Sequence, residues 1–448
     1  MRHFCFLTGL FVVLVPLTAE AGPADSPATP VLAPGESPNG LPALDLNAAL
    51  EEFDRNSPNL GAARAHLDES RAVIQEARAA LQPTAQAAGS YVRNNAEVAL
   101  NLGALLAQIP GAPNIPSTVI QPLDAWTASA AVRVPVFALS SWYDVDVAIA
   151  AVGVGEATFE SSRQQSHAAL ATLAYAQSAL EEVVHASERA VELAAEQVSS
   201  AERRTTAGTA APLDVLRART EFVSRQSDLA RANADLGRAR LALGVLLGRK
   251  GPVVVRVPEA EVFAAEPTRA GTRAELQALD ARSRLAKAQL ESAKARLWPT
   301  LSATGTVFAS NQPYPTGDKT GWRVGAELTI PLYDGGYRYG KRHEAEAALR
   351  ATAAELEAKE LSIQQETSDA EREIAVALER KRLAETRSGL AADAAASAKR
   401  SFDAGIATTL DVLDANDKLY KAEVALAEAK ARLAQAHIEL LRAKGAQP

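Results

Sequence analysis

The residue types that most often perform chemistry are few in this sequence and lie far apart. Histidine occurs at positions 3, 66, 167, 185, 343 and 437, and the stretch "HEAEA" (343–347) lacks the second histidine of a zinc-protease motif. "GVLLGRKG" (244–251) has the wrong spacing for a phosphate loop, and no serine or threonine follows its lysine. No serine occupies a G-x-S-x-G elbow. We therefore expect no catalytic residue, no metal site and no cofactor.

Aspartates recur in a more regular setting. "AGTAAPLDVL" begins at Ala207 and "AGIATTLDVL" begins at Ala404, and the two stretches agree at seven of ten positions. Asp214 and Asp411 hold the same place in them, and Asp414 follows the second. An aspartate in the first turn of a helix is favoured by the helix dipole alone. The residues by themselves therefore allow two roles, a helix start or a charged site. The helix-start explanation fits Asp214 and Asp411 better than it fits Asp414.

The repetition extends beyond these turns. "ARAALQPTAQAAGSYVRN" (77–94) aligns with 293–310, and "WTASAAVRVPVF" (126–137) aligns with 322–333. Such repetition fixes the architecture, so we expect two copies of a unit of roughly 200 residues. The expected parts are a first repeat over 44–248, a linker over 249–270 and a second repeat over 271–445. Each repeat is predicted as a helix, two strands, a long helix, a tip and a helix, with tips at 205–212 and 403–410.

The amino terminus reads as an export signal. Arg2 is followed by an apolar run and then by Ala19-Glu20-Ala21, which is typical of a signal peptide over 1–21. A membrane anchor is the alternative, but the run is shorter than the roughly 20 residues that a spanning helix needs. Residues 22–43 are Pro-rich, and we expect them to be extended. The net charge of −7, without a basic cluster, excludes a nucleic-acid partner.

The helices carry a heptad pattern. After each turn, large apolar residues recur every seven positions: Val215, Phe222, Leu229, Leu236 and Leu243, then Val412, Leu419, Leu426, Leu433 and Leu440. Alanine follows most of them by three residues, so the pattern indicates closely packed coiled coils. Proline-free stretches of about 60 residues precede both turns, and at ~1.5 Å per residue they would form rods about 90 Å long.

Four strands are predicted, over 84–95, 126–138, 300–310 and 322–333. Apolar residues alternate with polar ones in them, and Trp126 and Trp322 head the apolar faces of their strands. The pattern is typical of an outer-membrane barrel wall, although a sheet half covered by helices would show it too. Single-chain barrels need about eight strands, and an open sheet edge cannot exist in lipid. If these strands span a membrane, several chains must combine them.

Taken together, these features resemble the TolC-like outer-membrane efflux proteins. The resemblance rests on 44–84, on "IPLYDGGYRYG" (330–340) and on the two G-x-x-x-x-L-D-V-L turns. It implies an α+β membrane protein in the outer membrane of a Gram-negative bacterium, with a long periplasmic extension. It further implies a homotrimer with a twelve-stranded β-barrel and an α-barrel of long coiled-coil helices, coupled to a periplasmic adaptor and an inner-membrane transporter. A periplasmic coiled-coil adaptor or structural protein without a membrane barrel is the alternative.

The resemblance also assigns roles to residues of the tips. Asp411 and Asp414 match carboxylates that narrow the closed aperture, Asp214 matches a partner in the first repeat, and Arg217 could pair with a neighbouring chain. Where the family has an arginine and a tyrosine at the closed mouth, this chain has Ala407 and Phe402. The residues expected to dock the adaptor are Gly208, Thr209, Leu213, Gly405, Ile406 and Leu410. Trp126 and Trp322 are expected at the membrane interface, whereas the cargo, whether drugs, metal ions or proteins, is left open.

Overall fold

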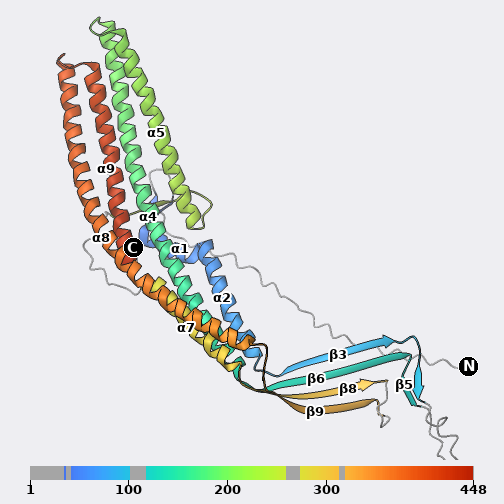
Figure 1. Cartoon of the computed structure of the whole chain (residues 1–448). Helices are drawn as coiled ribbons and strands as arrows, with labels where there is room; N and C mark the ends of the chain where they lie inside the picture. Colours follow the sequence, from blue (N-terminus) through green and yellow to red (C-terminus); the bar gives the residue numbers. More distant parts are fainter. Residues whose placement is uncertain (1–34, 37–41, 101–117, 259–272, 312–317, 447–448) are drawn as a thin grey trace, which may run out of the picture.

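The computed structural model describes residues 35–36, 42–100, 118–258, 273–311 and 318–446. Within these ranges the chain forms a bundle of long helices that continues at one end into a four-stranded sheet (Figure 1). The expected signal peptide lies outside the described residues, as do most of the Pro-rich segment and positions 259–270 of the expected linker. Among the described helices, none has a stretch long and apolar enough to span a membrane.

The helices are long and few. They are α1 (Leu46–Asn56), α2 (Pro58–Ala79), α4 (Leu139–Thr206), α5 (Pro212–Leu246), α7 (Ala274–Ala295), α8 (Tyr337–Asp403) and α9 (Thr409–Ala443). Alanine-rich composition and the absence of proline inside α4 and α8 favour uninterrupted helices of this length. With 68 residues, α4 is about 100 Å long. Pro58 and Pro212 stand at helix starts, where their missing N–H groups cost nothing.

Four long helices lie side by side in the order α8, α9, α4, α5 (Figure 1). The predicted heptad residues of α5 and α9 face inward in this layer: Leu236, Leu243, Val412 and Leu433 are buried. The small residues between them, such as Ala232 and Ala422, are buried as well. They allow the helix axes to approach closely, as the heptad pattern predicted. The heptad residues of α5 and α9 therefore pack these helices against other helices of the same chain.

The largest apolar core lies where α1, α4, α5 and α9 meet. Phe53, Leu170, Leu243 and Ile438 are almost fully buried there, one from each helix. A small sheet supports this core: β2 (Pro42–Asp45) pairs with β1 (Gly35–Glu36) and, in parallel, with β7 (Val254–Arg256). Sequence analysis predicted neither β2 nor β7. The expected linker over 249–270 gave no signal for β7, whose valines pair with a strand some 200 residues earlier in the chain.

The main sheet has the strand order β3-β6-β8-β9 and is antiparallel throughout. Its strands are β3 (Thr84–Arg93), β6 (Asp124–Ala138), β8 (Thr300–Ser310) and β9 (Thr320–Thr329), and β4 (Val98–Leu100) and β5 (Thr118–Gln121) form a short hairpin at its far end. The last strand was expected to reach residue 333 but ends at Thr329. Thr329 pairs with Thr300, the first residue of β8, so no partner is left beyond it.

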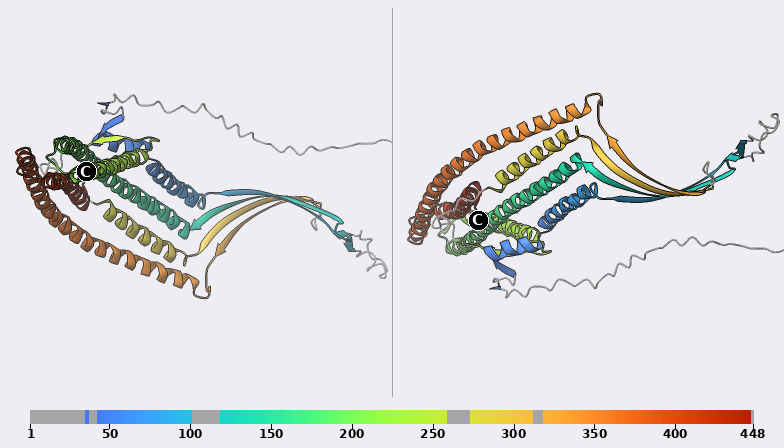
Figure 2. Two further views of the ribbon diagram at one scale, coloured as in Figure 1. Left: turned by 90° about the horizontal axis from the view of Figure 1, so that it is seen from above. Right: turned by 90° about the horizontal axis from the view of Figure 1, so that it is seen from below.

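Each strand of this sheet continues into one helix, and the helices keep the strand order. Figure 2 shows α2, α4, α7 and α8 following β3, β6, β8 and β9 as one curved layer. The strands enter the layer through short connections such as 80–83 and 296–299. The wall of the sheet is thus continuous with the wall of helices.

Candidate functional site: the tips and the polar face of the sheet

Both turns at the free end of the helices have the same backbone geometry. Gly208 and Gly405 have φ angles of 73° and 78°, in the left-handed region that glycine favours. The next N–H groups reach back into the preceding helix: Thr209 N donates to Arg204 O at 2.9 Å, and Ile406 N donates to Ser401 O at 2.8 Å. These are helix ends of the Schellman type, which explains why glycine recurs in both copies.

Asp411 closes a capping box at the start of α9. The Thr408 N–H and hydroxyl donate to Asp411 Oδ2 at 2.8 and 2.7 Å, and Asp411 N donates to Thr408 Oγ1 at 3.3 Å. The hydrogen bonds from Thr408, first from its hydroxyl and then from its backbone, hold the pKa of the Asp411 carboxyl below its usual range. The helix-start role that the sequence allowed is therefore present within a single chain.

The other acidic tip residues have partners on their own helices. Asp414 forms an ion pair with Lys418 at 2.7 Å. Asp214 lies 3.6 Å from Arg217, one turn away on α5. Arg217, which could also pair with a neighbouring chain, thus contacts an aspartate of its own chain. All of these charges lie within the first turns of α5 and α9.

Apolar side chains project from both tips. Ile406 and Leu410 are 83% and 57% exposed, and Leu213 and Leu216 are 52% and 61% exposed. The exposed apolar residues lie on the tip of each hairpin, next to the glycine turns. Nothing in the described chain covers them, so they form a surface suited to an external partner.

Two arginines that sequence analysis did not select join the hairpins. Arg204 of α4 lies over the Phe402 ring at 3.8 Å and donates to the Phe402 carbonyl oxygen at 2.6 Å. Arg225 of α5 donates to Asp417 of α9 at 2.6 Å and lies 4.7 Å from the Tyr420 ring. Arg225 is a charged residue at an inward-facing heptad position of α5, where most other repeats have alanine. A charge at such a position is the sequence signal that could have identified Arg225.

The sheet places most of its polar and apolar residues on opposite faces; the exceptions include Phe308 on the polar face and Arg93 and Asp124 on the apolar face. Because the strand partners share a face, one face carries Trp126, Ala128, Val132, Val134, Leu301, Ala303, Val307, Trp322, Val324 and Leu328. The opposite face carries Thr84, Gln86, Ser90, Thr127, Ser129, Arg133, Ser302, Thr304, Thr306, Arg323 and Glu327. Trp126 and Trp322 both lie on the apolar face and are exposed. Trp322 pairs with Val307, which in turn pairs with Ala130, so Trp322 lies at the same height in the sheet as Ala130.

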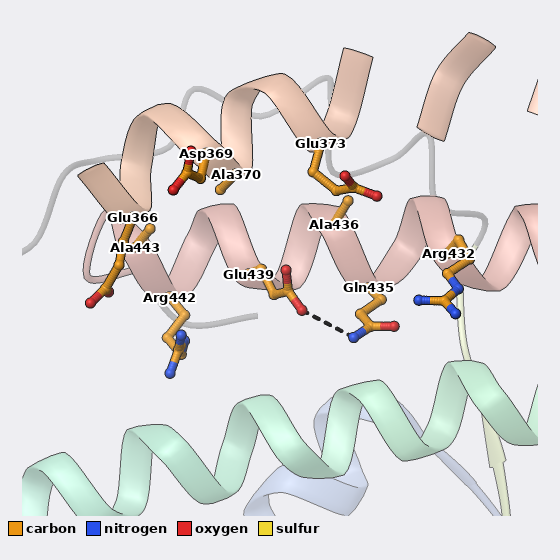
Figure 3. Close-up of a pocket in the computed structure, with 10 residues that line it drawn as sticks. All are labelled: Glu366, Asp369, Ala370, Glu373, Arg432, Gln435, Ala436, Glu439, Arg442 and Ala443. Atoms are coloured by element: carbon orange, nitrogen blue, oxygen red, sulfur yellow. Dashed lines mark hydrogen bonds between the residues drawn. The ribbon is translucent and has the colours of Figure 1, made fainter. Parts of the chain in front are cut away.

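The cavities of the described chain are open surface grooves. Figure 3 shows one of about 430 Å³ between α8 and α9, lined by Glu366, Asp369, Glu373, Arg432, Glu439 and Arg442 among others. The charged residues that α8 contributes are all carboxylates, whereas both arginines come from α9. Gln435 donates to Glu439 at 3.0 Å. A more apolar groove of about 970 Å³ lies between α4 and α5. Among the described residues there is no cluster of acidic, histidine or cysteine side chains that could hold a metal ion.

An amphipathic sheet that continues into a layer of very long helices defines a class of protein, the outer-membrane channels with a helical extension into the periplasm. The chain belongs to the outer membrane efflux protein family, whose model matches residues 49–249 and 270–446. It is therefore an outer-membrane efflux protein and not a periplasmic coiled-coil adaptor. The family and the fold are those of transport channels.

Individual relatives agree with this assignment. The chain is 28% identical over 161 residues to nodulation protein T of Rhizobium leguminosarum bv. viciae; the match spans 35% of this chain and 33% of that protein. The outer membrane protein VceC of Vibrio cholerae superposes with a TM-score of 0.71 at 20% identity, covering 90% of this chain and 96% of VceC. The CmeC outer membrane channel of Campylobacter jejuni gives 0.72 at 15% identity, covering 89% and 85%.

Proposed function

We propose that this chain works as a homotrimer in which three sheets close a twelve-stranded barrel in the outer membrane. The observation that carries the proposal is that the amphipathic sheet ends in two edge strands, β3 and β9, each of which has one side without a strand partner. Unpaired backbone N–H and C=O groups cost several kcal/mol each in hydrocarbon, so an edge must find a partner there. A second copy supplies that partner, with β9 of one chain beside β3 of the next.

The helical layer supports the same assembly. On an exposed side of α5, a second ladder runs through Leu216, Thr220, Val223, Ser227, Ala230, Ala234, Gly237 and Leu241. All eight positions are exposed and uncharged. On α8, Val376, Leu383 and Leu390 are spaced by seven residues and are also exposed. Such ladders are coiled-coil seams without a partner in their own chain.

The two seams lie at opposite edges of the layer, since α8 and α5 are its outer helices (Figure 1). Large residues on α8 and small ones in the middle of the α5 ladder are complementary in size. Counted from the tip, Leu390 on α8 and Val223 on α5 are each roughly three to four helical turns away. We infer that α8 of one chain packs antiparallel against α5 of the next, with these two residues close together.

The closed layer would be a tunnel through which an inner-membrane transporter exports its cargo. Three copies bring Asp411 and Asp414 together at the tip, where repulsion between like charges and attraction of cations make a charged aperture. Asp214 and Arg217 of the other hairpin lie beside it and complete the aperture. The exposed tip residues, including Gly208, Thr209, Leu213, Gly405, Ile406 and Leu410, would dock a periplasmic adaptor. Trp126 and Trp322 would meet the membrane interface.

Substitution of the apolar tip residues tests the coupling to an adaptor. We expect Ile406→Asp with Leu410→Asp to abolish both export and cross-linking to the adaptor, while the amount of outer-membrane protein stays unchanged because both side chains are exposed. Gln226→Asp, an exposed polar position on α5, is the control and should retain both. Full export by the Ile406→Asp, Leu410→Asp variant would contradict the docking role.

A further inference from the structure

The polar face of the sheet carries three charged side chains. They are Arg133 on β6 and Arg323 and Glu327 on β9. Arg133 and Glu327 form an ion pair at 3.2 Å that reaches across β8. Arg323 has no ion-pair partner among the residues that the structure describes. The polar face therefore has one balanced pair and one unbalanced positive charge per chain.

Register places Arg323 one step farther from the helices than this pair. Arg323 is opposite Thr306, whereas Arg133 is opposite Thr304. Residues two apart on a strand point to the same side and are about 7 Å apart along it. The other charged residues of these strands, Arg93 and Asp124, pair at 3.5 Å at the far end of the apolar face. They leave the charge of the polar face unchanged.

In an outer-membrane barrel the apolar face meets lipid and the polar face lines the lumen. We propose that Arg323 is a selectivity residue: three copies form a positive ring in the barrel lumen that favours the passage of anions over cations. This inference rests on the proposed trimer. It gives the conduit two charge filters in series, a positive ring in the barrel and the carboxylates at the tip, so that small anionic cargo is favoured in the barrel.

The size of the effect follows from the geometry of a twelve-stranded barrel. With strands about 4.8 Å apart and tilted by roughly 40°, the guanidinium groups lie roughly 10 Å from the axis. Three charges at that distance, in water and at about 0.1 M salt, favour an anion and disfavour a cation by about twofold each, so the ratio of anion to cation permeability changes about fivefold. In 1 M salt the screening length falls to about 3 Å, and the effect should vanish.

The test is the reversal potential of single channels in a planar bilayer under a KCl gradient. The background is Asp411→Ala with Asp414→Ala, so that the tip does not limit selectivity. We expect Arg323→Gln to shift the chloride to potassium permeability ratio about fivefold toward potassium at about 0.1 M salt, and Arg323→Lys to keep it. Glu327→Gln, which frees Arg133, should shift the ratio the other way.

Arg93→Gln is the matched control, because it removes the same charge from the apolar face and should leave the ratio unchanged. A conducting Arg323→Gln channel with the same ratio as its background would overturn the selectivity role. An equal shift in the Arg93→Gln channel would overturn it too, because the site of the charge would then not matter. Failure of the background protein to form channels at all would instead overturn the proposed conduit, and the two failures are thereby distinguished.

Discussion

At the scale of single residues, one carboxylate serves the fold and a proposed function together. Asp411 Oδ2 accepts both hydrogen bonds from Thr408, so the helix start fixes the position of this negative charge at the tip. Asp414, one turn further, is held by Lys418. A ring of such carboxylates would therefore be ordered before any cation arrives, and ordered ligands bind with less entropic cost.

The proposed aperture predicts a conductance change. We expect Asp411→Ala with Asp414→Ala to raise single-channel conductance and to abolish block by multivalent cations, because the charges that attract cations are gone. Thr408→Ala is the control: it removes the cap, at a cost of about 1 kcal/mol of helix stability, but keeps both carboxylates. Bilayer recordings measure both quantities, and cation block that persists in the double variant would remove the aperture role.

Residue types with a local cause were predictable from the sequence. Gly208 and Gly405 take left-handed backbone conformations because a helix ends at each of them, and the residues that signal a helix end are neighbours in the sequence. The partners of Arg204 and Arg225 were not predictable, since they lie about 200 residues away and depend on how the hairpins align. The ion pair between Arg133 and Glu327 was not predictable for the same reason, because it requires the strand order β6-β8-β9.

At the scale of elements, the two hairpins are joined by polar contacts over an alanine-rich seam. Arg225 is the most enclosed of these links, with Glu221, Asp228 and Asp417 around it and Tyr420 beneath its guanidinium. Burial alone would lower the pKa of Arg225, but the hydrogen bonds that its guanidinium donates to Glu221 and Asp417 raise that pKa, so the charge is held. This cluster fixes the position of α9 relative to α5 close to the tips.

Removal of this link should destabilise the tip end of the bundle. We expect Arg225→Ala to lower the free energy of unfolding by roughly 2 kcal/mol per chain, because enclosed carboxylates lose their partner; the partial exposure of those carboxylates keeps the loss below the range for fully buried pairs. Arg231→Ala, an exposed arginine on the same helix, should change it by less than about 0.5 kcal/mol. Thermal unfolding and protease sensitivity of the tips measure the effect, and equal behaviour of the two variants would contradict it.

The boundaries of the elements followed from the sequence where the cause is local. Pro58 and Pro212 start helices, and the heptad residues Val412 and Leu433 face inward as predicted. The second ladder of α5 was missed because Ser227, Ala230 and Gly237 are small and carry no hydrophobic signal. Only the burial pattern shows that this uncharged face has no partner. Strand β7 was missed because its partner, β2, lies some 200 residues earlier, at the end of the Pro-rich segment, so no local pattern connects the two strands.

At the scale of the whole molecule, a single chain leaves two kinds of edge open. The sheet ends in unpaired β3 and β9, and the helical layer ends in exposed seams on α5 and α8. Because the helices α2, α4, α7 and α8 keep the order of the strands, one rotation of the chain can close both layers together. The central claim is that identical chains share these edges to build one continuous conduit.

Cross-linking between the two helical edges tests this claim most directly. Cys5 is the only cysteine of the sequence and lies in the expected signal peptide, so introduced cysteines can be read without background. In outer membranes treated with a short bismaleimide, Leu390→Cys with Val223→Cys should give covalent dimers and trimers. The pair Leu378→Cys with Val223→Cys, with Leu378 off the α8 seam, should stay monomeric. If the first pair yields only monomer although the protein is folded and inserted, the shared conduit is contradicted.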